Sequence, residues 1–135
     1  VLLYLGVAPF VFAASLTEPF QQMYPFYDDA SRSIVDFFAW QCLYAAQFIC
    51  LEFFFRGFLI HGLKRRFGIY AIAVSTNPYS MIHFGKPFIE TLGADIAGVA
   101  LGLLSLLTGS VWLGAAIHIS VAFTMDLLAI IWESG

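Results

Sequence analysis

Apolar stretches about as long as a bilayer is thick dominate this sequence of 135 residues. Of its residues, 61% are hydrophobic and only 11% are charged, whereas a soluble domain is about half apolar and about one quarter charged. A chain of this length cannot hide so much apolar surface from water. The sequence therefore predicts an all-α fold, a polytopic transmembrane helix bundle. It excludes a soluble enzyme, a disordered segment and a nucleic-acid-binding protein, so no nucleic acid is expected as a partner.

Five stretches are candidate membrane helices, because about 20 apolar residues cross a bilayer. They are residues 1–17, 33–63, 68–83, 90–107 and 110–132. The polar residues 18–32, which include the Asp28-Asp29 pair, are expected to form a loop. We accordingly divide the chain into residues 1–33, the first span with its polar loop, and residues 34–135, the core helices.

Local signals refine these helices. Ser33, followed three positions later by Asp36, is typical of a capping box at a helix start. Asn77-Pro78 predicts a kink or a break, because proline cannot donate a helical hydrogen bond. A small residue at every fourth position from Ala94 to Gly102 predicts a seam where two helices pack closely.

The ends of the helices carry the information on topology. Residues 1–17 lack a basic start and a clear cleavage site, so they are expected to be a span rather than a signal peptide. The chain begins with Val1 instead of Met, as a fragment or a processed product would.

The basic cluster Lys64-Arg65-Arg66 should lie in the cytoplasm, and the loop with Lys86 should lie outside. We expect an integral, multi-pass protein whose partners include the lipid bilayer.

Ionisable side chains inside the apolar stretches are the informative part of the sequence, since each costs about 2.5–3.5 kcal/mol on insertion scales. They are Glu52, Arg56, His61, His83, Glu90, Asp95, His118 and Asp126. Glu52 and Arg56 are spaced for an ion pair on one helical face. That pair can be purely structural or part of a site.

Depth along the helices groups four of these side chains, at a rise of about 1.5 Å per residue. Measured from the cytoplasmic helix ends, Glu52 lies about 18 Å deep, Arg56 and His118 about 12 Å, and His83 about 21 Å. If their faces point inward, they form one buried polar site. Glu90 and Asp126, at about 24–27 Å, are secondary candidates.

A glutamate with two histidines supports two chemistries. The carboxylate can act as a general base on water, with a histidine sharing the proton. Alternatively, the three groups can ligate a divalent metal that lowers the pKa of bound water. No H-E-x-x-H motif is present, so a metal site would require convergence of residues from separate helices.

Three segments together resemble the motifs of the CPBP family, the CAAX prenyl protease 2 and bacteriocin-processing group of intramembrane endopeptidases. Residues 52–57 (EFFFRG) resemble its first motif. Residues 81–85 (MIHFG), with Tyr79 four positions before the histidine, resemble its second, and residues 116–118 (AIH) its last. The resemblance covers about residues 34–131.

The resemblance implies an intramembrane endopeptidase that hydrolyses a peptide bond. Glu52 and His83 would activate water, His118 would donate to the oxyanion, and Arg56 would hold Glu52 in place. If the enzyme uses a metal, zinc is the candidate, with Glu52, His83 and His118 as its ligands. The implied partner is a peptide or protein substrate, with prenylated ones among the candidates.

Two positions depart from the family pattern. The first of two consecutive glutamates, which is the usual catalytic one, is Leu51 here, and the asparagine one turn after the last histidine is Ala122. Glu90 is the obvious substitute acid. Loss of an oxyanion donor costs on the order of 3 kcal/mol of transition-state stabilisation. Asp126, one turn further along, could replace that donor only if protonated.

These departures keep two other hypotheses open. One is a non-catalytic membrane module of this fold, for self-immunity or scaffolding, in which Glu52 and Arg56 form a structural pair. The other is a transporter or channel subunit, in which Glu52, His83 and Asp126 relay protons along a water path.

Overall fold

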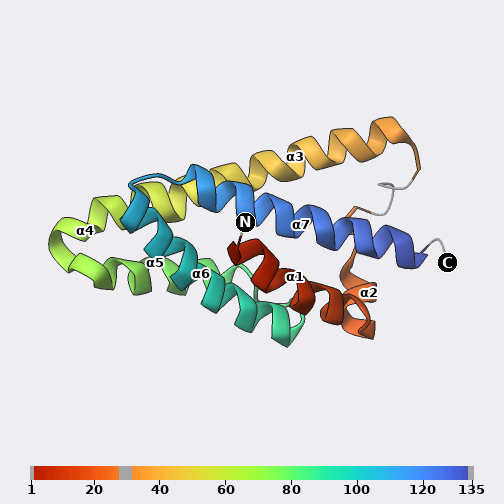
Figure 1. The fold of residues 1–135 in the computed structure, drawn as a ribbon, viewed down its shortest axis with the longest axis horizontal. Helices are drawn as coiled ribbons and strands as arrows, with labels where there is room; N and C mark the ends of the chain where they lie inside the picture. Colours follow the sequence, from red (N-terminus) through yellow and green to blue (C-terminus); the bar gives the residue numbers. More distant parts are fainter. Residues whose placement is uncertain (1, 28–31, 134–135) are drawn as a thin grey trace. The chain divides into compact units, whose positions relative to one another are not determined.

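The computed structural model describes residues 2–27 and 32–133, so the Asp28-Asp29 pair lies outside the described residues. Within the described residues helices are the only regular secondary structure, as predicted (Figure 1). The elements are α1 (Leu2–Ser15), α2 (Glu18–Met23), α3 (Ile34–Glu52), the π-helix η2 (Phe53–Ile60), α4 (His61–Phe67), the 3₁₀-helix η3 (Gly68–Tyr70), α5 (Ala71–Met81), α6 (Phe88–Thr108) and α7 (Trp112–Glu133).

The predicted membrane helices correspond to these elements. Three helical segments are long and apolar enough to cross a bilayer, namely Ile34–Met81, Phe88–Thr108 and Trp112–Trp132, and Leu2–Ser15 is a shorter apolar helix. The first of them includes α5, which runs back beside η2 after the chain turns at Gly68 (Figure 1). Five predicted stretches thus agree with the helices α1, α3 with its extension, α5, α6 and α7.

Two local expectations are corrected and one is confirmed. The segment expected to be a loop contains the short helix α2, whose proline occupies the first turn, where no amide donor is needed. Of the kink or break predicted at Pro78, the break is wrong, because α5 continues through Pro78 to Met81. The kink stays a prediction. The capping box is confirmed, since the Asp36 amide donates to Ser33 Oγ at 3.1 Å and that hydroxyl donates to the Asp36 carboxylate at 2.7 Å.

The chain divides into two compact units. Unit 1 consists of Val1–Phe48 and Ala116–Gly135, and unit 2 of Ile49–Ala115. In unit 1, α7 contacts the N-terminal helices. Tyr4 Oη lies 2.7 Å from Thr124 Oγ1, and Trp132 Nε1 donates to Ser15 Oγ at 3.3 Å. The rings of Phe20 and Tyr24 pack with Ala129 in an apolar cluster.

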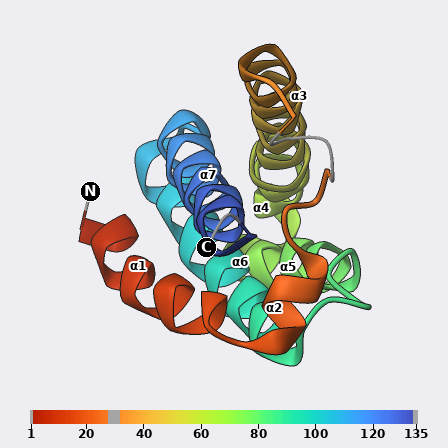
Figure 2. The same cartoon turned by 90° about the vertical axis from the view of Figure 1, so that its right-hand side faces the viewer.

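In unit 2, α5 lies side by side with α6 as well as with η2 (Figure 2). Gly68 adopts a φ of +55°, which a residue with a side chain rarely adopts, and it ends α4. The predicted seam on α6 is confirmed at two positions. A Cβ on Gly98 would lie 2.7 Å from Thr76 Cγ2, and one on Gly102 would lie 3.0 Å from Ile60 and Ile72.

Candidate functional site

The helix that carries the first motif widens at that motif. Glu52 is the last residue of α3, and the eight residues Phe53–Ile60 that follow form the π-helix η2. Such π segments are rare and occur frequently at functional sites. The apolar pattern of residues 33–63 predicts one regular helix and gives no sign of this change, because no pattern within the segment distinguishes a π-helix from an α-helix.

Two serines from neighbouring helices donate to carbonyls of this π-helix. Ser75 Oγ of α5 donates to the Phe55 carbonyl at 2.6 Å, and Ser105 Oγ of α6 donates to the Arg56 carbonyl at 3.1 Å. Both serines are buried. In an apolar surrounding, a backbone carbonyl without a donor is costly, so these hydroxyls stabilise the widened segment. Sequence reasoning missed both serines, although polar residues within apolar stretches are a usable signal.

Glu52 and Arg56 form the ion pair that their spacing predicts. Arg56 Nη1 lies 3.3 Å from Glu52 Oε1. Arg56 is only 1% exposed and Glu52 is 0% exposed. Gly114 leaves room for this carboxylate, since a Cβ there would lie 3.1 Å from Glu52 Oε2. A pair so deeply buried requires close packing and further contacts to offset its desolvation.

Tyr79 connects this ion pair to His83. The Arg56 guanidinium lies over the Tyr79 ring, with Cζ 3.9 Å from the ring centroid. On the same residue, the ring centroid lies 4.9 Å from that of His83, and the Tyr79 carbonyl accepts a hydrogen bond from His83 Nδ1 at 3.2 Å. The residues Glu52, Arg56, Tyr79 and His83 therefore form one continuous series of contacts within unit 2.

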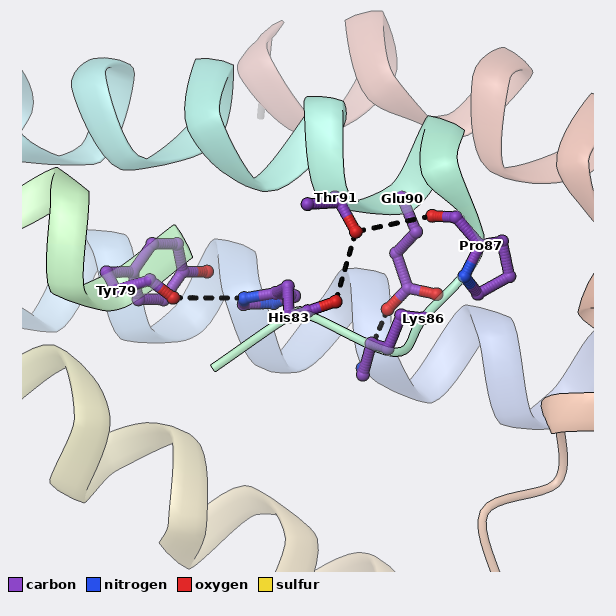
Figure 3. A network of polar contacts seen from close by, with 6 residues as sticks. All are labelled: Tyr79, His83, Lys86, Pro87, Glu90 and Thr91. Carbon is purple, nitrogen blue, oxygen red and sulfur yellow. Dashed lines mark hydrogen bonds and ion pairs between the residues drawn. The ribbon is translucent and has the colours of Figure 1, made fainter. Parts of the chain in front are cut away.

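The connection from α5 to α6 places His83 and Glu90 in the same network (Figure 3). Thr91 Oγ1 donates to the His83 carbonyl at 3.0 Å, and Lys86 Nζ lies 2.7 Å from Glu90 Oε1. Figure 3 shows the His83 ring directed toward Tyr79, whereas the Glu90 carboxylate is directed toward Lys86. His83 and Glu90 are both half-buried.

Two further predicted residues lie in unit 1. His118 is half-buried, with its ring centroid 4.3 Å from that of Phe48. Asp126 is 0% exposed, and its Oδ2 accepts hydrogen bonds from Trp40 Nε1 at 2.8 Å and from Gln41 Nε2 at 3.0 Å. Since Glu52 and His83 lie in unit 2, their meeting with His118 stays a prediction.

The two remaining candidates of the eight named from the sequence, His61 and Asp95, have local partners in unit 2. His61 Nε2 lies 3.0 Å from Ser105 Oγ, and Lys64 Nζ lies 3.1 Å from His61 Nδ1. The hydroxyl of Ser80 donates to the Asp95 carboxylate. These contacts explain how both side chains are tolerated in apolar helices without a catalytic role.

Leu51 occupies the position at which the resemblance leads us to expect a catalytic acid, and its side chain makes apolar packing contacts there. Leu51 is half-buried and packs against the cluster of Phe55, Tyr79 and Ala94. In unit 1, Ala122 is buried and brings no polar side-chain atom. Each departure from the family pattern is therefore accommodated by packing.

A bound zinc ion needs several donor side chains that converge on one point. Among the residues that the structure describes, no group of three or more His, Cys, Asp and Glu side chains is placed to hold a metal ion. Glu52, moreover, has the Arg56 guanidinium 3.3 Å away, and this cation repels a metal ion. A zinc site formed by Glu52, His83 and His118 stays a prediction, and no step of the proposed reaction passes through a metal.

Comparison with known proteins agrees with the resemblance of the motifs. Residues 33–124 match the model of a family described as type II CAAX prenyl endopeptidase Rce1-like. The match contains η2, α5, α6 and the part of α7 that carries His118. No curated protein matches the chain, and no solved structure does.

Proposed function

Since the chain belongs to the type II CAAX prenyl endopeptidase Rce1-like family, whose model matches more than half of it, we propose that it cleaves a peptide bond of a substrate held at the membrane. It is a helical membrane protein of an endopeptidase family, as its motifs predicted. The observation that carries the proposal is the series of contacts from Glu52 through Arg56 and Tyr79 to His83. It joins the buried ion pair of the first motif to the half-buried histidine of the second.

In the proposed reaction, Glu52 and His83 activate a water molecule. His83 donates from Nδ1 to the Tyr79 carbonyl, so the ring in its neutral form has Nε2 as the basic nitrogen. A base in this position accepts a proton as the water oxygen forms a bond to the substrate carbonyl carbon. The carbonyl oxygen becomes an oxyanion, to which His118 donates. Cleavage of the carbon–nitrogen bond then returns the proton to the leaving amine.

Glu90 is the alternative acid in this proposal. It lies in the first turn of α6, directly after the connection that carries His83, and its carboxylate pairs with Lys86. Glu52, by contrast, is buried between the Arg56 guanidinium and the backbone at Gly114. We favour Glu52 because its pair with Arg56 is linked to His83 through Tyr79.

A second candidate function is a non-catalytic membrane module of the same fold. It is favoured by one observation, the packing of Leu51 into the apolar cluster of unit 2. In this case the buried ion pair is only structural. If the folded protein cleaves none of the test peptides, this second function is favoured over the first.

Cleavage of defined peptides by the reconstituted protein tests the first proposal. The substrates are a peptide with a C-terminal CAAX sequence and its prenylated form, and products are identified by mass spectrometry. We expect Glu52→Gln and His83→Gln each to lower the rate by on the order of 10²–10⁴-fold, and Glu90→Gln to leave it nearly unchanged. Preference for the prenylated peptide would establish the lipid-modified substrate class.

Two controls make the result decisive. Each variant must retain the far-ultraviolet circular dichroism of the parent, because Glu52 is also a packing residue. Incubation with a chelator is expected to leave the rate unchanged, and loss of activity that zinc restores would instead assign the chemistry to a metal. Full activity of the folded Glu52→Gln and His83→Gln proteins would refute the assignment.

A further inference from the structure

The turn at the end of α4 combines exposed cations with exposed apolar rings. We call residues 64–70 the basic turn. Lys64, Arg65 and Arg66 form the last turn of α4 and are all exposed. The apolar residues that follow are exposed as well, Phe67 at 41%, Ile69 at 64% and Tyr70 at 74%.

The positive charge of the basic turn is not balanced by nearby acids. No Asp or Glu occurs between residues 53 and 89. Within the described part of the chain, no ion pair joins a carboxylate to Lys64, Arg65 or Arg66. Lys64 Nζ instead donates to His61 Nδ1 at 3.1 Å, and the Arg66 guanidinium lies 5.9 Å from the centroid of the Phe67 ring.

Cations at the end of a helix are also explained by the helix dipole, which favours positive charge at a C-terminus. This explanation accounts for the three basic residues but not for the three exposed apolar residues beside them. In water such an apolar group would be unfavourable. At a membrane surface the combination is favourable, because aromatic residues prefer the headgroup level and cations attract anionic lipids.

We propose that the basic turn is a binding surface for anionic phospholipids. Lys64, Arg65 and Arg66 bind the headgroup phosphates, and Phe67, Ile69 and Tyr70 lie at the boundary between headgroups and acyl chains. Planar guanidinium groups match phosphate oxygens with two hydrogen bonds each, so Arg65 and Arg66 should contribute most of the selectivity. This surface lies wholly in unit 2 and is independent of peptide cleavage.

Lipid selectivity of the reconstituted protein tests this proposal. The protein is placed in nanodiscs of mixed phosphatidylglycerol and phosphatidylcholine, and the lipids that it retains on extraction are counted by native mass spectrometry. We expect retention of phosphatidylglycerol well above its share of the bilayer. The double variant Arg65→Gln/Arg66→Gln should lower this enrichment by on the order of fivefold per charge, while the Lys64 contact to His61 is kept.

A matched variant separates this surface from general charge. Arg32→Gln/Lys86→Gln also removes two cations, but these cations pair with Asp36 and Glu90. It should leave the enrichment unchanged. Arg65→Lys/Arg66→Lys keeps the charge but loses the paired hydrogen bonds of the guanidinium groups, so its enrichment should fall clearly below that of the parent while staying above that of the glutamine variant. It serves as the test if the glutamine variant does not fold, and enrichment equal to that of the parent would then count against the proposal.

Three outcomes would overturn the proposal. They are equal retention of the two lipids by the parent protein, unchanged enrichment in Arg65→Gln/Arg66→Gln, and displacement of the bound lipid by inorganic phosphate at constant ionic strength. The last would identify a site for free phosphate in place of a membrane surface. None of these measurements requires catalysis, so a failure of the lipid-binding proposal can be distinguished from a failure of the proposed function.

Discussion

Arg56 is the residue on which most contacts of the candidate site depend. Its guanidinium pairs with Glu52 and lies over the Tyr79 ring, while its carbonyl accepts the hydrogen bond of Ser105. A planar, delocalised cation can make these contacts together, whereas a lysine ammonium cannot stack in the same way. The arginine of the first motif thus connects the acid to the second motif.

Removing this arginine should destabilise the protein strongly. Arg56→Ala leaves the Glu52 carboxylate buried without its guanidinium, and we expect the free energy of unfolding to fall by about 3–5 kcal/mol. Denaturation in detergent, followed by circular dichroism, measures the change. The double variant Glu52→Gln/Arg56→Met should recover most of the loss, because it removes both charges. A loss below about 1 kcal/mol would contradict the buried pair, since exposed pairs contribute that little.

At the scale of elements, the close contact of α5 with α6 positions the candidate site. Gly98 lets α6 approach Thr76 and Tyr79 of α5, and Ser75 on α5 donates to the π-helix. The same helix ends at the connection that carries His83. An increase in the distance between α5 and α6 should therefore disturb both motifs at once.

Gly98→Ala tests this close approach. The new Cβ would lie 2.7 Å from Thr76 Cγ2, so we expect a loss of about 1–3 kcal/mol in the free energy of unfolding. Gly93→Ala is the matched control on the same helix, because a Cβ there meets no atom within 4 Å. It should be neutral or stabilise the helix by about 0.5–1 kcal/mol. Thr76→Ala should partly rescue Gly98→Ala, and equal effects of the two glycine substitutions would exclude the seam.

At the scale of the whole molecule, the membrane is the main constraint. In the described part of the chain, three segments are long and apolar enough to cross it, and their exposed apolar side chains suit lipid better than water. The side of the membrane on which each connection lies is a prediction from charge alone.

Labelling of single cysteines tests that orientation. In a background with Cys42 and Cys50 replaced by alanine, Arg65→Cys should react with an impermeant maleimide only after the cells are permeabilised. Phe84→Cys, on the exposed connection between α5 and α6, should react in intact cells. The reverse pattern would invert the orientation.

The sequence by itself determined the helical membrane class, the limits of most helices, the cap at Ser33 and the family. These features depend on local composition, spacing and motif order, which a linear chain contains. It also predicted the pair of Glu52 and Arg56, because residues four apart share one face of a helix. His83 was identified differently, as an ionisable residue in an apolar stretch and by its motif, and the catalytic roles of Glu52, Arg56 and His83 stay predictions.

Only the tertiary structure decided the π-helix, the position of Tyr79 beneath Arg56 and the roles of the two serines. Each depends on residues far apart in the sequence, since Ser75 and Ser105 donate to carbonyls in another helix. Local propensity could not foresee the continuity of α5 through Pro78 either, because packing against neighbours outweighs one lost hydrogen bond. Contacts between helices stabilise a widened turn or a buried charge, and the sequence of either helix alone does not show which contacts will form.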